Sequence, residues 1–212
     1  MRSLIFPAIL ALLLSACTPS EKKLPILGSR EPVEKVVNGQ TVIDTVYQTI
    51  PAFRFLNQDS TVITNKDFDG KIYVADFFFT SCTAICPIMH RNMMNVYEEF
   101  KGNDEVKLLS HSIDTKYDVP SRLKKYSQKL GLEGTQWEFA HGSRDEVYGI
   151  AEKAYLTSVG EDADAPGGYI HQGWFVLVDK DKRLRGAYDG TDEKQVEQLI
   201  ADMHTLLREY EK

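Results

Sequence analysis

An almost unbroken apolar segment followed by helical spacing marks the centre of the chain. Residues 72–79 are nearly all apolar and are bounded by Gly70 and Thr80. The segment is too short for an independent helix, so it predicts a strand that is buried on both faces. Helical spacing begins just beyond it, and Pro87 suits the first turn of a helix because its missing N–H has no intrahelical partner there. A strand, a short turn and a helix are therefore expected in succession.

Strands and helices alternate through the rest of the chain. Ahead of the central strand, residues 41–47 alternate in polarity, and residues 53–56 and 61–64 flank a turn-forming quartet and predict a hairpin. Later strands are expected at 106–113, 137–140, 174–179 and 184–188, and helices at 87–100, 120–130, 145–155 and, with Thr191 as N-cap, to the C-terminus. This is the thioredoxin order, which predicts an α/β fold with a mixed central sheet, helices on both faces and an N-terminal hairpin.

The N-terminus carries an export pattern. An apolar run from Leu4 to Leu14 ends in Leu-Ser-Ala-Cys17, and it is too short to span a bilayer permanently but long enough for a signal-peptide core. The ending resembles the bacterial lipobox. We therefore expect residues 1–16 to be a lipoprotein signal peptide and Cys17 to carry lipid, with an ordinary signal peptide as the alternative. An exported, membrane-anchored lipoprotein facing the periplasm would follow.

Composition then divides the remainder. Residues 17–40 are polar and interrupted by proline and glycine, so we expect a flexible tether behind the lipidated cysteine. Residues 41–212 are long enough for one domain with a real core. The net charge is −6, and no basic patch argues for nucleic acid as a partner.

The turn after the central strand holds Cys82 and Cys86, two of the three cysteines. The partial positive charge of a helix N-terminus favours thiolates, so we expect both to be more acidic than free cysteine. Their four-residue spacing allows them to share one metal ion or, with modest adjustment, to form a disulfide. Export favours either outcome, because periplasmic thiols tend to be oxidised unless they are metal-bound or actively reduced. A disulfide that only staples the loop would contribute little, since so short a loop has little closure entropy to remove.

Between about Phe53 and the C-terminus, several residues form a pattern with a particular order and spacing. They are Cys82-x3-Cys86-Pro87, Ser112-Ile113-Asp114 with Asp118, Tyr126, Trp137, and His171 ahead of Trp174–Asp179. In this order they resemble the Sco/SenC family of membrane-attached, thioredoxin-fold copper proteins. The resemblance implies that Cys82, Cys86 and His171 bind copper. It also implies a metallochaperone that helps assemble the dinuclear copper A centre of cytochrome c oxidase, with the copper A-bearing subunit as partner.

The residue types agree with copper. Two thiolates and an imidazole form a soft set that suits Cu(I), and Cu(II) when a further ligand is added, although zinc would compete. The glycine-rich, acidic residues 160–168 predict a mobile loop that admits and releases a metal. We leave other donors out of the ligand set: His90 is expected on a helix surface, His111 beside the site, and Met89, Met93 and Met94 in the core.

Asp76 keeps a second function open. It lies inside the buried strand, where thioredoxins keep an aspartate that handles protons and where many Sco sequences carry an uncharged residue. A buried carboxylate is costly unless partnered or protonated, so Asp76 predicts either proton handling or a paired structural role. The alternative function is a membrane-anchored thiol–disulfide oxidoreductase that keeps partner cysteines reduced, with Cys82 and Cys86 as its redox-active pair. It would need a thiol reductant, whereas the chaperone would need a copper donor.

Overall fold

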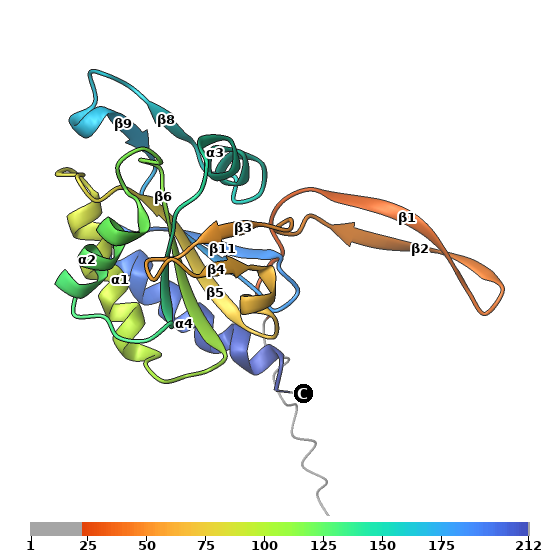
Figure 1. The fold of residues 1–212 in the computed structure, drawn as a ribbon. Coiled ribbons are helices and arrows are strands. Elements are labelled where there is room, and N and C mark those ends of the chain that lie inside the picture. Colours follow the sequence, from red (N-terminus) through yellow and green to blue (C-terminus); the bar gives the residue numbers. More distant parts are fainter. Residues whose placement is uncertain (1–22, 212) are drawn as a thin grey trace, which may run out of the picture.

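A five-stranded mixed sheet forms the centre of the computed structural model, which describes residues 23–211 (Figure 1). The strand order is β11-β10-β5-β6-β7. The parallel strands are β5 (Ile72–Phe78), β6 (Val106–Ser112) and β7 (Trp137–Ala140), and β10 (Trp174–Val178) runs antiparallel to β5 and to β11 (Leu184–Asp189). The helices are α1 (Cys86–Glu99), α2 (Pro120–Lys129), α3 (Arg144–Lys153) and α4 (Glu193–Glu209). The predicted thioredoxin-like α/β fold is confirmed.

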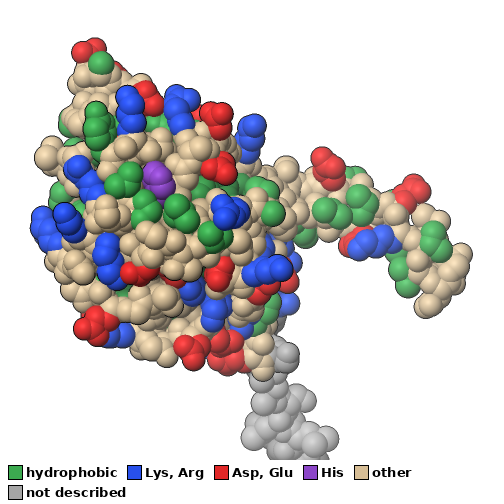
Figure 2. All heavy atoms as spheres, viewed as in Figure 1, with side chains coloured by type: hydrophobic (Ala, Val, Ile, Leu, Met, Phe, Trp, Pro, Cys, Tyr) green, Lys and Arg blue, Asp and Glu red, His purple; other side chains and the backbone are tan. Residues whose placement is uncertain are grey.

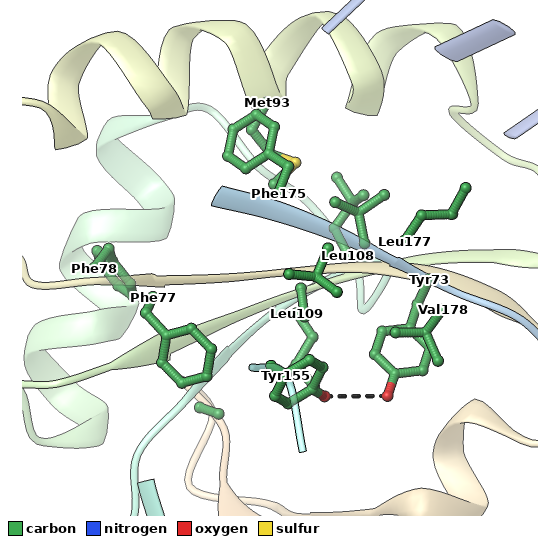
Figure 3. Packing of buried hydrophobic residues seen from close by; sticks show 14 of the residues in the cluster. Tyr73, Phe77, Phe78, Met93, Leu108, Leu109, Tyr155, Phe175, Leu177 and Val178 are labelled. Atoms are coloured by element: carbon green, nitrogen blue, oxygen red, sulfur yellow. Dashed lines mark hydrogen bonds between the residues drawn. The ribbon is translucent and has the colours of Figure 1, made fainter. Parts of the chain in front are cut away.

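Strand β5 is covered on both faces, as its apolar sequence predicts. Every residue of the strand is buried. Met93 of α1 and Phe175 of β10 lie together on one side of the sheet (Figure 3). On the other side the hydroxyls of Tyr73 and Tyr155 share a 3.0 Å hydrogen bond (Figure 3). The strand that leads to Cys82 is thus held rigidly from two directions.

Helices and a small hairpin supply the two covering layers. Helices α1 and α4 contact each other, and α4 also contacts β5 and β11. The opposite layer comprises β3 (Arg54–Leu56), β4 (Val62–Thr64), the 3₁₀ turn η1 (Asn65–Phe68) and the chain leaving α3. There the ring of Phe68 packs on Tyr73, and that of Tyr155 packs on Phe77. The predicted hairpin of residues 53–64 is therefore present as β3 and β4.

Residues 30–37 depart from the expected tether. They form β1 (Arg30–Val37), which pairs antiparallel with β2 (Gln40–Tyr47) in an arm that projects from the domain (Figure 1). Figure 2 shows hydrophobic side chains along this arm, where Val36 and Ile43 are 74% and 69% exposed. We expected no regular structure before Gln40 because prolines and glycines interrupt the sequence. The pairing with β2 supplies the hydrogen bonds that local composition does not reveal.

The segment before the arm is docked on the domain. The Leu27 N–H donates to the Leu184 carbonyl at 2.8 Å, and the Arg185 guanidinium donates to the carbonyls of Leu24 and Pro25. The signal peptide and Cys17 lie outside the described residues. Among residues 23–211, no helix has the length and apolar character needed to cross a bilayer.

Smaller differences concern helix ends. The N-cap of α4 is Asp192, whose side chain accepts from the Lys194 N–H, whereas the predicted cap, Thr191, bonds to Asp189 instead. Helix α1 begins at Cys86, one residue before the predicted start. Thr191 and Asp192 are both residue types that can cap a helix, and only the backbone geometry distinguishes them.

Candidate metal centre

Cys82, Cys86 and His171 meet at one end of the central sheet. Their ligand atoms all lie within 4.8 Å of one another. The Nε2 atom of His171 is 3.2 Å from the Cys86 sulfur and 4.0 Å from the Cys82 sulfur. The fold therefore brings His171 next to two cysteines that lie 89 and 85 positions earlier in the chain, as expected for the metal ligands.

The cysteines belong to the rigid part of the domain. The chain leaves β5 at Phe79, whose carbonyl accepts from the Cys82 N–H at 3.1 Å, and it enters α1 at Cys86 with Pro87 in the first turn. Cys82 is 9% exposed and Cys86 only 1%. One sulfur therefore lies close to the surface and the other is enclosed by the core.

The buried carboxylate of Asp118 holds the cysteine turn in place through hydrogen bonds. Asp118 is fully buried and accepts from the Thr80 N–H at 2.8 Å and from the Ser112 hydroxyl at 2.7 Å. The Arg122 Nε lies 3.3 Å from the same carboxylate. The sequence alone suggests no physical role for Asp118, because the contact of this residue with Thr80 spans 38 positions and has no local signal.

His171 stands on a separate two-stranded unit, the β8–β9 hairpin. It comprises β8 (Val159–Glu161) and β9 (Tyr169–His171), with Val159 opposite His171. We expected residues 160–168 to form a loop, and the structure differs because short paired strands flank it. The imidazole lies edge-on to Phe79 at 5.8 Å between ring centroids, and its Nδ1 is buried without a hydrogen-bond partner among the described residues. Nε2 is therefore the nitrogen that faces the sulfurs.

The two thiols differ in acidity. Both are free in the structure. A hydrogen bond from Cys86 is the largest cause that lowers the pKa of Cys82, to about 3, and His171 adds to it against the effect of burial. Donating to the ionised Cys82 and being buried both raise the pKa of Cys86. The expectation that both cysteines are more acidic than free cysteine is wrong for Cys86, because two thiolates this close cannot both be favoured.

Asp76 is fully buried and partnered on both carboxylate oxygens. The Ser110 hydroxyl donates to one oxygen, and the Nε2 atom of His90 lies 3.3 Å from the other. The Nδ1 atom of His90 is 2.7 Å from the Tyr126 hydroxyl, and the Trp137 indole donates to Ser110. His90, expected on a helix surface, is only 1% exposed because its helix turns that face toward β5. The paired role of Asp76 is observed, and its proton handling stays a prediction.

Other donors lie away from the sulfurs or in the core. Met89 and Met93 are fully buried, as expected for core residues. His111, expected beside the site, packs instead among Phe55, Phe77 and Tyr155. Burial lowers its pKa to about 4, so this imidazole stays neutral at physiological pH.

The fold and the site together define a thioredoxin-like domain that carries two cysteines and one histidine, a donor set for a soft metal ion. The model of the SCO1/SenC family matches residues 43–208, and the chain belongs to this family.

Three solved structures show how close the likeness is. A SCO1/SenC family lipoprotein from Bacillus anthracis is 30% identical, with a TM-score of 0.69 over 76% of this chain and 95% of that chain. BsSco, a member of the Sco family of cytochrome c oxidase assembly proteins with a disulfide switch, is 28% identical, with a TM-score of 0.66 over 75% and 93%. Copper-bound ScoI from Bradyrhizobium japonicum shares the fold at 20% identity, with a TM-score of 0.62 over 74% and 99%.

Proposed function

We propose that this protein is a copper-binding metallochaperone that helps assemble the copper A centre of a respiratory cytochrome c oxidase. The observation that carries the proposal is the meeting of two sulfurs and one imidazole nitrogen within 4.8 Å. Family membership supports the assembly role, and the copper A-bearing subunit is the proposed recipient. Copper is the cargo in this scheme, received from a donor and passed on.

The donor set suits transfer. Cys82 supplies a thiolate at neutral pH, and Cys86 must give up its proton when copper enters, so uptake releases the Cys86 proton. His171 Nε2 completes a soft three-donor set for Cu(I), and a further ligand would accommodate Cu(II). An incoming ligand of the recipient has a path beside Cys82, since a pocket of about 190 Å³ lies between the cysteine turn and residues 165–171.

The alternative is a thiol–disulfide oxidoreductase that keeps partner cysteines reduced. The free, closely spaced thiols and the acidic Cys82 favour it, as does the disulfide switch of BsSco. Against it, the imidazole lies where a metal ligand is needed, and disulfide exchange does not require one. Copper binding therefore accounts for more of the site.

The placement of the protein is part of the proposal. We infer that it is exported and held on the periplasmic side of a membrane by lipid on Cys17, which the lipobox-like ending and the likeness to a family lipoprotein support. Replacing Cys17 by serine should leave the protein unlipidated and released when membranes are washed. Continued acylation of that variant would refute the anchor.

Copper stoichiometry tests the function. The domain should bind one Cu(II) with sulfur-to-copper charge-transfer bands, and the double change Cys82→Ala, Cys86→Ala should abolish both. His204→Ala serves as a matched control, because that imidazole is half-exposed and contacts Glu99 and the Phe100 ring. Unchanged copper uptake in the double variant would refute Cys82 and Cys86 as metal ligands. Strong insulin reduction by the parent that collapses in Asp76→Asn would favour the oxidoreductase.

A further inference from the structure

The β8–β9 hairpin is held unevenly: β8 contacts α3 and its Val159 is buried, whereas β9, which carries His171, has no fully buried residue. Its two strands pair only with each other and are not part of the central sheet. Ile170, the middle residue of β9, is 51% exposed. A unit with few buried contacts and exposed backbone hydrogen bonds opens at low free-energy cost.

Two side-chain hydrogen bonds outside the metal centre fasten the hairpin to the domain. Glu161 of β8 accepts from the Arg144 Nε of α3 at 2.9 Å, and because both side chains are 56% exposed this surface pair contributes little. The other bond belongs to β9, the strand that carries His171. The Tyr169 hydroxyl donates to Oδ1 of Asp114 at 3.0 Å. Asp114 is 3% exposed, and the same oxygen accepts from the Tyr117 N–H at 3.1 Å, so the carboxylate is held in a fixed turn. The hairpin is thus tied to the loop that follows β6.

An apolar seat adds to this bond. The Tyr169 ring packs against Phe79 at 5.1 Å between centroids. A Cβ at Gly167, which has φ of +81°, would lie only 2.6 Å from the Phe79 ring. Only glycine allows the turn before β9 to approach Phe79 so closely.

The same loop also holds the other half of the site. Asp114 and Asp118 are four residues apart and are joined by a 3.0 Å bond from the Asp118 N–H to the Asp114 carbonyl. Asp118 accepts from Thr80, two residues before Cys82, while Asp114 accepts from Tyr169, two residues before His171. Residues 114–118 therefore set the distance between the cysteine turn and the histidine hairpin.

We propose that Tyr169 is a positioning residue whose bond to Asp114 latches the hairpin shut, and that breaking this bond lets His171 leave the metal during release. The proposal rests on the copper-binding function proposed above. The latch acts on the β8–β9 hairpin alone, because the cysteines are held by β5, α1 and Asp118. It should govern how long copper stays bound more than whether it binds.

Tyr169→Phe isolates the latch, because it removes the hydroxyl and keeps the ring on Phe79. Transfer of Cu(I) to an excess of chelator should be at least fivefold faster than in the parent, with the thermal midpoint nearly unchanged. In the metal-free protein, hydrogen exchange should speed up over residues 159–171 and not over α1. Tyr117→Phe is the matched control, since that ring is 63% exposed on the same loop.

Variants of Asp114 complete the test. Asp114→Asn keeps an acceptor oxygen and should largely retain slow release, whereas Asp114→Ala should match Tyr169→Phe. The double variant Tyr169→Phe, Asp114→Ala should be no faster than either single variant, because both remove one interaction. Release and exchange in Tyr169→Phe within twofold of the parent, or fully additive effects, would overturn the latch. A parent that takes up no copper would instead refute the proposed function.

Discussion

The two halves of the metal centre are built in different ways. The cysteine half continues directly from β5, every residue of which is buried, into α1. The histidine half is a two-stranded hairpin outside the central sheet, with an exposed isoleucine at the middle of β9. Cys86 is enclosed by the core, while His171 depends on Phe79 and on the neighbouring Tyr169 for its position.

This difference suits a protein that must both keep and surrender an ion. Two fixed sulfurs define where the metal lies, and a lightly held third ligand can leave without disturbing the fold. A site whose three ligands all came from the core would bind more rigidly and release more slowly. The contrast makes separate predictions for stability, affinity and reactivity in the two halves.

Stability should show the largest contrast. Met93→Ala removes a fully buried side chain between α1 and the sheet, and it should cost about 2–5 kcal/mol of unfolding free energy. Ile170→Ala, on the exposed strand of the hairpin, should change stability by less than about 0.5 kcal/mol. Urea titrations of both variants measure this. Similar losses in the two would mean that the hairpin is as firmly packed as the core.

Copper affinity should show the next largest effect, through the histidine ligand. His171→Ala should weaken Cu(I) binding at least tenfold, about 1.4 kcal/mol, because two thiolates alone leave the ion under-coordinated. The fold should survive, since the imidazole is on the hairpin. Competition against a Cu(I) chelator measures the change, with His204→Ala as control. An affinity equal to that of the parent would remove His171 from the ligand set.

Replacing Asp76 tests whether the buried network serves the fold. Asp76→Ala leaves the Ser110 hydroxyl without its acceptor and the Nε2 atom of His90 without its partner, which should cost about 1–3 kcal/mol. Asp76→Asn keeps one acceptor oxygen and should cost less. Thermal unfolding of both variants, with copper affinity measured alongside, checks this. A large loss of thiol reactivity in Asp76→Asn with unchanged stability would favour proton handling instead.

Thiol reactivity should show the smallest change with pH. The pKa of Cys82 is lowered to about 3, so it remains a thiolate from pH 5 to pH 8 and its alkylation rate should vary by less than about twofold. The rate should fall only as the pH approaches 3. Cys86, with a raised pKa, should react far more slowly. Mass-spectrometric mapping of iodoacetamide labelling distinguishes them, and equal labelling would contradict the asymmetry.

Most of the fold could be predicted because its signals are local. The apolar run of β5, the helical spacing and Pro87 place the cysteine turn with only one residue of error at α1. Strand β7 begins and ends at the predicted residues. The ligand set came from soft residue types together with a family resemblance, and the structure brings the three together.

The remainder depends on partners far away in the chain. Strand β1 forms only because β2 pairs with it, and its own composition suggests a linker. His90 faces inward because Asp76 and Tyr126 lie there. The unequal pKa values of Cys82 and Cys86 follow first from the hydrogen bond between the two thiols and then from burial, neither of which their spacing reveals.

The docked segment before the arm would limit where a lipid-anchored domain can work. Arg185 holds the Leu24 carbonyl, so a lipid on Cys17 would be separated from the domain by only seven Cα-to-Cα steps, or roughly 25 Å when fully extended. With lipid on Cys17, as proposed above, so short a connection would confine the domain to a thin layer of solvent along the bilayer. Within that layer the domain would meet a membrane-bound recipient at a much higher effective concentration than in bulk solvent. Encounters would then depend on lateral diffusion, and copper would rarely travel far from the membrane.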